Sequence, residues 1–467
     1  MSDALTWGSA LELAAMIRGK QVSPVEVAEA HLARIEALNP ALNAYCTVTA
    51  DVARRAAREA EIAVQKNEPL GPLHGVPVSI KDAIYTRGIR TTCGSRLFAD
   101  FVPEEDAIAV ARLRAAGAVI LGKTMTSELG HMATTRNAMF GPTHNPWRRE
   151  RTAGGSSGGA AAAVAAGLGP LALGTDGGGS VRIPASFCGV VGFKPSYGRV
   201  PQHPGFPGYE HLLVTGPLTR TVRDAAAMLD VIAGGDDRDR VSLPREPGAY
   251  LEACDEDVKG LHVAWSPDLG YAAVDAAVLA RCEDAAAEFE TLGCHVEVVN
   301  PAWEDIEELF RTLVAAQFYA HWSDQLPAAE AQMDPLLVRL IRKGGSITAR
   351  EYVLAEERAK AYWTEVVTFL SRFDFLLTPT VAVPPFAGER PPHEVAGREV
   401  SVLGWMPFCF PFNLTGQPAA SVPAGFTDDG LPVGLQIVGR RHADRAVLAA
   451  AAAFEAARPW SERRPTP

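Results

Sequence analysis

Two glycine- and serine-rich stretches occupy the middle of the chain: residues 153–159, Ala-Gly-Gly-Ser-Ser-Gly-Gly, and residues 174–180, Gly-Thr-Asp-Gly-Gly-Gly-Ser. Glycine has no Cβ, so the amides of such stretches can turn toward one point and bind an anion. Phosphate is the weaker interpretation, because neither stretch continues as Gly-Lys-Ser/Thr and no Gly-x-Gly-x-x-Gly opens a helix. Ser180 ends the second stretch, and its hydroxyl would lie beside these donors, which favours the oxyanion of an acyl-transfer reaction.

The segments around these stretches alternate between helix and strand. A small apolar helix is expected over residues 160–166 and a short strand over residues 171–173. The first of the preceding helices opens with Ser23-Pro24-Val25-Glu26, a capping box with proline at the first helical position. The N-terminal patterns predict helices over residues 23–38, 51–65 and 107–116, and strands over residues 76–80 and 119–121. This alternation predicts an α/β fold.

The C-terminal half contains more charged helix. Residues 222–363 are mostly alanine-rich, charged helix, with strands expected near residues 262–264 and 295–299. A buried strand is expected at residues 375–377 and a hairpin over residues 418–438. No linker or shift in composition marks a boundary. We therefore expect one domain over residues 1–467, with a catalytic core at about 70–200 and an embedded helical region at about 222–370.

The composition is that of a globular protein and limits the classes of function. The chain has 467 residues, of which 47% are hydrophobic. It carries 44 lysines and arginines against 55 aspartates and glutamates, a formal net charge of −11. A disordered chain is therefore excluded, and no nucleic-acid partner is expected, because no basic surplus is available to neutralise phosphates.

The cysteines and the apolar segments indicate the compartment. Seven cysteines occur without a Cys-x-x-Cys pair, which favours reduced thiols in a cytoplasmic protein and offers no zinc site. We expect no signal peptide and no metal or organic cofactor. Residues 152–175 are uncharged, but they contain seven glycines and Pro170, so no membrane partner is expected.

A series of motifs resembles the amidase signature family, the serine hydrolases with a Ser-cisSer-Lys triad. These motifs are residues 75–82 (GVPVSIKD), 122–124 (GKT), 140–147 (FGPTHNPW), 152–159 (TAGGSSGG), 174–185 (GTDGGGSVRIPA), 187–195 (FCGVVGFKP), 413–419 (NLTGQPA) and 430–436 (GLPVGLQ). The resemblance extends from about residue 5 to residue 460. It implies an α/β/α sandwich, in which helices cover both faces of a large, mixed, twisted β-sheet.

The resemblance also implies the roles of individual residues. Ser180 matches the nucleophile, Ser156 the bridging serine after a cis peptide bond, and Lys81 the general base. The matches to the oxyanion hole are the backbone amides of Gly177, Gly178, Gly179 and Ser180, and the supporting positions are Ser157, Asp176 and Arg182. Gly177 departs from the family, in which threonine or an aliphatic residue is common there. The amide is retained, and a looser loop is expected.

The residues of this triad make chemical sense together. A serine hydroxyl becomes a good nucleophile only when a neighbouring base removes its proton. A lysine with an ordinary pKa near 10.4 is neutral in fewer than roughly one molecule in a thousand at pH 7, so Lys81 needs burial or a nearby cation. Ser156 would relay the proton between Ser180 and Lys81 and return it to the leaving amine. We therefore expect cleavage of a carboxamide C–N bond in a small molecule, with esters, anilides and urethanes as further substrates.

Three alternatives remain open at this point. The first is structural: Ser156 and Ser157 cap the following helix, and Lys81 is a solvated strand end. The second is an α/β-hydrolase, because two frames around Ser156 and Ser157 satisfy Gly-x-Ser-x-Gly. That elbow requires a hydrophobic strand, whereas residues 148–153 read Arg-Arg-Glu-Arg-Thr-Ala. The third is a glutamine-hydrolysing subunit of a transamidosome, which would share the triad.

The sequence specifies the substrate pocket far less than the triad. The residues expected to line it, from three segments around 125–136, 318–322 and 405–412, are Met125, Met132, Phe318, Trp322, Trp405 and Phe408. The aromatic and proline-rich segment 405–412 favours an apolar channel over a site for glutamine. A homodimer is the favoured oligomeric state.

Overall fold

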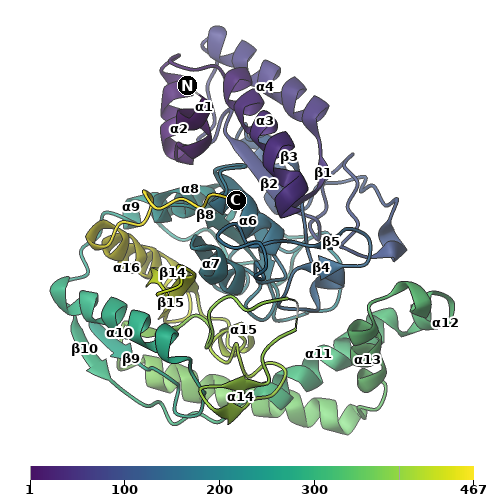
Figure 1. The fold of residues 1–467 in the computed structure, drawn as a ribbon, viewed down its shortest axis with the longest axis vertical. Helices are drawn as coiled ribbons and strands as arrows, with labels where there is room; N and C mark the ends of the chain where they lie inside the picture. Colours follow the sequence, from purple (N-terminus) through teal and green to yellow (C-terminus); the bar gives the residue numbers. More distant parts are fainter. Residues whose placement is uncertain (1, 389) are drawn as a thin grey trace.

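The computed structural model describes residues 2–388 and 390–467 (Figure 1). In this part of the chain, eleven strands form one sheet. In spatial order they are β1 (Tyr45–Val48), β3 (Val119–Thr124), β2 (Pro77–Lys81), β6 (Leu171–Asp176), β8 (Val214–Thr219), β7 (Val191–Lys194), β14 (Ala419–Phe426), β15 (Pro432–Gly439), β11 (Phe375–Pro379), β9 (His262–Trp265) and β10 (His295–Val298). Two short ribbons lie outside the sheet: β4 (Arg136–Asn137) with β5 (Gly141–Pro142), and β12 (Glu394–Val395) with β13 (Arg398–Glu399).

The directions of the strands make the sheet mixed. β2 pairs in parallel with both β3 and β6, and β9 pairs in parallel with both β10 and β11. The pairs between β6 and β11, through β8, β7, β14 and β15, are antiparallel. Lys81 therefore ends a strand whose parallel neighbour, β6, leads into the second glycine-rich stretch.

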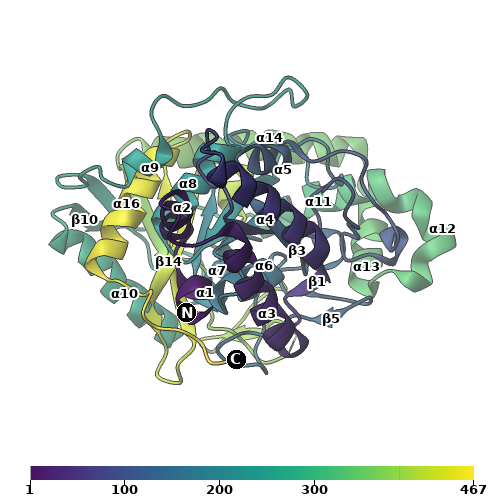
Figure 2. The same cartoon turned by 90° about the horizontal axis from the view of Figure 1, so that it is seen from above.

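Helices cover both faces of the sheet, because alternate residues of a buried strand point into different cores. In β3, Ile120 belongs to one core, whereas Val119 and Leu121 belong to the other. One face is covered by α2 (Ala10–Arg18), α5 (Ile108–Ala115), α8 (Val222–Ile232), α9 (Tyr250–Ala253), α10 (Ala276–Thr291) and α16 (Asp444–Ala457). The other is covered by α3 (Pro24–Leu42), α4 (Ala50–Gln65), α6 (Gly158–Ala165), α7 (Arg182–Cys188), α11 (Glu307–Trp322), α13 (Pro335–Gly344) and α14 (Ala349–Leu370). This arrangement confirms the predicted α/β/α sandwich (Figure 2).

Local patterns correctly located most of these elements. Ser23 Oγ accepts from the amides of Val25 and Glu26, and the Glu26 carboxylate accepts from the Ser23 amide, which confirms the capping box of α3. β6 is longer than the expected strand and continues through Asp176. The strands β1, β7 and β8 were not predicted from the sequence. Glycine and proline interrupt the alternation in β7 and β8, and long-range pairing stabilises them instead.

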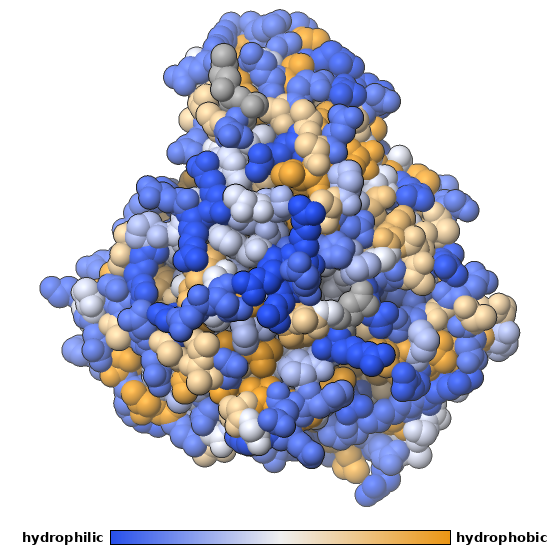
Figure 3. Space-filling view, in the orientation of Figure 1, coloured by the Kyte–Doolittle hydropathy of each residue, from blue (hydrophilic) through white to orange (hydrophobic). Residues whose placement is uncertain are grey.

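The remaining short helices and the chain ends complete the molecule. The short helices are α1 (Ser2–Trp7), α12 (Leu326–Ala329) and α15 (Pro411–Leu414). The two chain ends meet, because the Arg464 guanidinium lies 4.7 Å from the centre of the Trp7 ring. The face in Figure 3 is mostly hydrophilic, with apolar side chains scattered across it. Within the described residues, no helix is both long and apolar enough to cross a membrane.

Candidate active site

Lys81 lies at the buried end of β2, beside β6. Its side chain is fully buried. Its Nζ hydrogen-bonds with Ser156 Oγ at 2.7 Å and with Thr175 Oγ1 at 2.8 Å. Parallel pairing of β2 with β6 places Lys81 near Thr175, because Ile80 is paired with Leu173. The solvated-strand-end alternative is therefore wrong.

Burial also changes the acidity of this lysine. Removal of the ammonium from water lowers the pKa of Lys81 to about 7, although the Asp176 carboxylate opposes this shift. A large fraction of Lys81 is then neutral near pH 7. The sequence predicts that either burial or a nearby cation lowers the pKa of Lys81, and burial is what lowers it.

The first glycine-rich stretch brings Ser156 to Lys81. The Gly155–Ser156 peptide bond is cis. A Cβ on Gly155 would lie 2.5 Å from the Thr134 backbone, so only glycine allows this close approach. Ser157 occupies the N-cap position of α6, but its side chain makes no capping hydrogen bond. The helix-capping alternative is therefore wrong for Ser157, and the Ser156 hydroxyl is directed to Lys81 instead.

Ser157 connects the two glycine-rich stretches. Its hydroxyl donates to the Thr175 carbonyl at 3.1 Å, and its amide donates to the Ser180 carbonyl at 3.2 Å. Ser156 and Ser180 line the same cavity. The two segments that carry the predicted relay and nucleophile are thus joined directly.

The second stretch connects β6 to α7 and presents amides near Ser180. The Gly179 amide donates to Asp176 Oδ1 at 2.7 Å, so it is already engaged, unlike the free donor expected from the sequence. Among the described residues, no acceptor pairs with the amides of Gly177, Gly178 or Ser180. Three of the four predicted amides are therefore unpaired within the described residues, and their role as an oxyanion hole stays a prediction.

An ion pair beneath this stretch holds it in place. Arg182 Nη2 lies 2.9 Å from Asp176 Oδ1, and both side chains are fully buried. Burial alone would raise the pKa of Asp176, but the guanidinium and its hydrogen bonds hold that pKa well below its usual range. Arg182 also donates to Asn413 Oδ1 at 2.6 Å and to Gln436 Oε1 at 2.7 Å. Asp176 and Arg182 thus support the loop, and Asn413 and Gln436, from two C-terminal motifs, are partners to which the sequence assigned no role.

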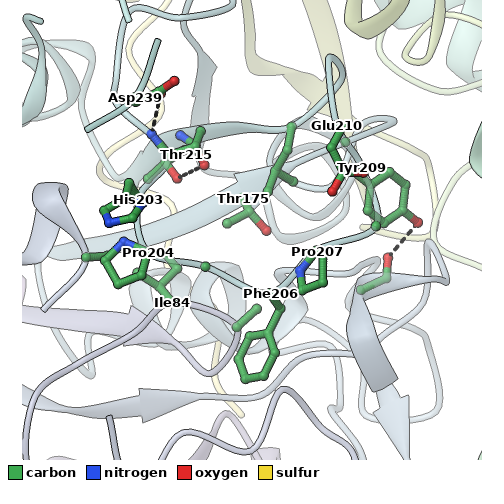
Figure 4. Close-up of a pocket in the computed structure, with 18 of the residues that line it drawn as sticks. Ile84, Thr175, His203, Pro204, Phe206, Pro207, Tyr209, Glu210, Thr215 and Asp239 are labelled. Atoms are coloured by element: carbon green, nitrogen blue, oxygen red, sulfur yellow. Dashed lines mark hydrogen bonds between the residues drawn. The ribbon is translucent and has the colours of Figure 1, made fainter. Parts of the chain in front are cut away.

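The cavity has a volume of about 360 Å³ and opens beside Ser156 and Ser180. Its outer wall is the segment 201–211, which includes the labelled residues His203, Phe206 and Tyr209 (Figure 4). The Phe206 ring packs against Tyr85 and Phe98, with ring centres 5.1 and 4.8 Å apart. This wall was not predicted from the sequence, because its prolines and glycines leave no periodic pattern of apolar residues.

The six side chains predicted to line the pocket lie outside the wall of this cavity. Trp405 stacks on Phe187 in the core, and Phe408 and Met125 are fully buried. Met132 contacts Arg136, and Trp322 packs edge-on against Phe98. Phe318 lies behind Tyr209, with ring centres 5.2 Å apart. The apolar segment 405–412 thus builds the core under α7, because large apolar residues serve a core as well as a channel.

Comparison with known proteins identifies the family of this chain. The sequence pattern of the amidase family, described as Amidase, matches residues 26–448. This chain belongs to the amidase signature family. An acylamidase of Rhodococcus erythropolis is 43% identical over 99% of this chain and 98% of its own length. A solved bacterial aryl acylamidase of the amidase signature family superposes with a TM-score of 0.92, at 34% identity over 98% of this chain and 97% of its own.

Another branch of the family is also similar. A glutamyl-tRNA(Gln) amidotransferase subunit of Carboxydothermus hydrogenoformans is 37% identical over 98% of both chains. The resemblance inferred from the sequence motifs is thus confirmed, and similarity to both branches leaves the choice between them to the site and to experiment.

Proposed function

We propose that this protein is a serine hydrolase that cleaves the C–N bond of small carboxamides through an acyl-enzyme on Ser180. One observation carries the proposal: Lys81, a buried lysine with a pKa of about 7, contacts Ser156, and Ser156 and Ser180 line the same cavity. Similarity to the acylamidase supports the same reaction class.

The geometry suggests a proton path for the first half of the reaction. Neutral Lys81 has two N–H bonds and one lone pair, so it can donate to Thr175 Oγ1 and accept the Ser156 proton. Ser156 Oγ would in turn take the proton of Ser180 as Ser180 Oγ bonds to the substrate carbonyl carbon. The negative charge on the carbonyl oxygen would be stabilised by the amides of Gly177, Gly178 and Ser180.

The second half would return the proton. The C–N bond breaks as Ser156 gives its proton to the leaving nitrogen and regains one from Lys81. A water molecule then adds to the acyl-enzyme by the same route, and the carboxylic acid leaves Ser180. Esters, anilides and urethanes present a carbonyl to the same nucleophile and are further substrates in this proposal.

A covalent inhibitor tests the nucleophile. Phenylmethylsulfonyl fluoride or an activated phosphonate should add one label to the peptide that contains Ser180, and Ser180→Ala should abolish both labelling and turnover. A label on Ser156 or Ser157 in the wild-type protein would contradict the assignment.

A substrate panel tests the reaction class against the transamidosome alternative. The purified chain should hydrolyse small amides or anilides by itself, and we expect weaker activity on glutamine. If glutamine is the only substrate that is hydrolysed, and its hydrolysis requires an added partner protein, the result would favour the other branch of the family. The homodimer remains a prediction, which sedimentation of the same sample would measure.

A further inference from the structure

The ring of Tyr209 occupies the space that a side chain at position 177 would need. A Cβ on Gly177 would lie 2.8 Å from Tyr209 Cδ1 and 3.0 Å from its Cγ. These separations are well inside the optimum of about 3.5–4.0 Å for two carbon atoms. The absence of a side chain at 177 and the position of the aromatic ring at 209 therefore depend on one another. The sequence predicts a looser loop at Gly177, and in the structure the Tyr209 ring packs against this loop at that position.

The other end of Tyr209 reaches the opposite side of the site. Its hydroxyl donates to the Gly130 carbonyl at 3.2 Å (Figure 4). Gly130 ends the short helix η2 (Glu128–Gly130), and a Cβ there would lie 3.5 Å from Ser156 Oγ. Tyr209 thus spans from the amides beside Ser180 to the surroundings of Ser156.

Packing behind Tyr209 restricts its movement away from the cavity. The fully buried Phe318 ring meets Tyr209 edge-on, with an angle of 83° between the ring planes. The same ring supports the preceding residue, because a Cβ on Gly208 would lie 3.1 Å from Phe318 Cε2. The tyrosine is therefore held at its ring by Gly177 and Phe318 and at its hydroxyl by Gly130.

We propose that Tyr209 is a specificity-determining residue, which limits the thickness of the leaving group that can reach Ser156. This inference rests on the proposed function, because Ser156 is placed there as the group that protonates the leaving nitrogen. The leaving group must then lie on the Ser156 side, where the Tyr209 hydroxyl is anchored. A flat leaving amine fits beside the Tyr209 ring, whereas an amine with substituents above and below the plane of its own ring clashes with Tyr209.

Two anilides with the same acetyl group test the inference. Acetanilide carries a flat leaving group, and the ortho methyl groups of 2,6-dimethylacetanilide turn its ring out of the amide plane and thicken it. Tyr209→Ala should raise kcat/KM for the thick anilide relative to the flat one by about tenfold or more, as expected for relief of a steric clash. Tyr209→Phe should keep the wild-type ratio, because it retains the ring. Tyr250→Ala is the matched control, since Tyr250 lies on α9, in the core on the opposite face of the sheet, and outside the wall of the cavity.

The pair of residues can be tested as a unit. Gly177→Ala should reduce turnover of both anilides, because the new Cβ collides with the Tyr209 ring. The double variant Gly177→Ala/Tyr209→Ala should recover most of that loss. Additive losses in the double variant would contradict the mutual dependence.

The affinity of the inactive protein separates this inference from the proposed function. In a Ser180→Ala background, calorimetric binding of the two anilides should show the same change of ratio when Tyr209 is truncated. This readout holds even if turnover is absent, whereas absence of turnover in the wild-type protein would count against the proposed function alone. Equal changes for both anilides, or a change that follows the acyl group instead, would overturn the role of Tyr209.

Discussion

Lys81 differs from the other buried lysines in what its amine contacts. Lys123 and Lys194 are also fully buried. Lys123 Nζ donates to the Ile84 carbonyl and to two threonine hydroxyls, and Lys194 Nζ donates to the Pro195 carbonyl. Only Lys81, among these three, contacts a serine hydroxyl. Burial lowers the pKa of each of these lysines. Among the three, only Lys81 contacts hydroxyl groups of residues that line the cavity beside Ser180, namely those of Ser156 and Thr175.

The pH dependence of turnover follows from the pKa of Lys81. Protonated Lys81 cannot accept a proton, so kcat/KM for an amide should rise with pH through about 7 and then level off. Below that pH, it should fall roughly tenfold per unit, as for a single essential base. Lys81→Ala should lose about 10²-fold or more. The exposed Lys360→Ala serves as the control. A wild-type profile that is flat from pH 6 to 9 would contradict this assignment.

Ser156 should matter most when the leaving group needs a proton. An amine leaves poorly unless it is protonated, whereas p-nitrophenolate leaves unaided. Ser156→Ala should therefore reduce kcat/KM for an anilide more than for a p-nitrophenyl ester with the same acyl group. The double variant Lys81→Ala/Ser156→Ala should be hardly worse than either single variant, since members of one relay fail together. Equal losses of kcat/KM on both substrates, together with additive losses in the double variant, would contradict the relay and leave Ser156 only a role in the conformation of its loop.

At the scale of elements, the connection from β6 to α7 depends on one buried ion pair. Asp176 ends the strand, Arg182 begins the helix, and the glycines between them carry no side chains to fix the turn. The carboxylate accepts from the amides of Gly179 and Val181, so it sets the path of the backbone around Ser180.

Removal of the arginine should therefore damage both stability and activity. Arg182→Met leaves the Asp176 carboxylate buried without its cation, and should lower the free energy of unfolding by about 3–5 kcal/mol. Urea denaturation measures this loss, and amide turnover should fall with it. Arg223→Met is the matched control, because its pair with Asp255 is exposed and should be worth only about 0–1 kcal/mol. Similar effects of the two substitutions would contradict the proposed role of the ion pair.

At the scale of the whole molecule, one sheet connects distant parts of the chain. The helical region at about 222–370 supplies β9 and β10, and β9 pairs in parallel with β11. β14 pairs with β7, which returns the C-terminal hairpin to the centre of the sheet. Strands from both halves of the chain thus share hydrogen bonds.

This continuity predicts a single unfolding transition. Loss of the helical region would expose the edge of β11, and loss of the hairpin would expose β7, so partial unfolding should be unfavourable. Calorimetry should show one peak whose calorimetric and van't Hoff enthalpies agree. Two separate transitions would contradict the single-domain expectation.

The sequence alone indicated the positions of Lys81, Ser156 and Ser180. A single glycine-rich stretch is more often a turn, so the prediction depended on the joint pattern of two such stretches, their serines and the upstream strand-end lysine, and on surrounding motifs that match one family. The helices α3, α4, α5 and α6 and most strands were likewise predicted, because the repeat of apolar residues is a local property, whereas α2, α7 and α16 were not predicted. β7 and β8 were not, since glycine and proline weaken the local pattern and pairing across the sheet decides their structure.

Only the tertiary structure decided the surroundings of these residues. Thr175 contacts Lys81, and Tyr209 lies over Gly177, although the members of each pair are distant in sequence. Asp176 and Gly179 are only three residues apart, but the path of the backbone between them decides that the Gly179 amide donates to the Asp176 carboxylate. For the same reason, the sequence did not place the six predicted pocket residues relative to the cavity, whose wall they do not line. Trp405 and Phe408 are apolar whether they line a channel or fill a core, and residue type does not specify which side of α7 they occupy. Long-range packing made that choice, because apolar burial is favourable in either place and carries no direction.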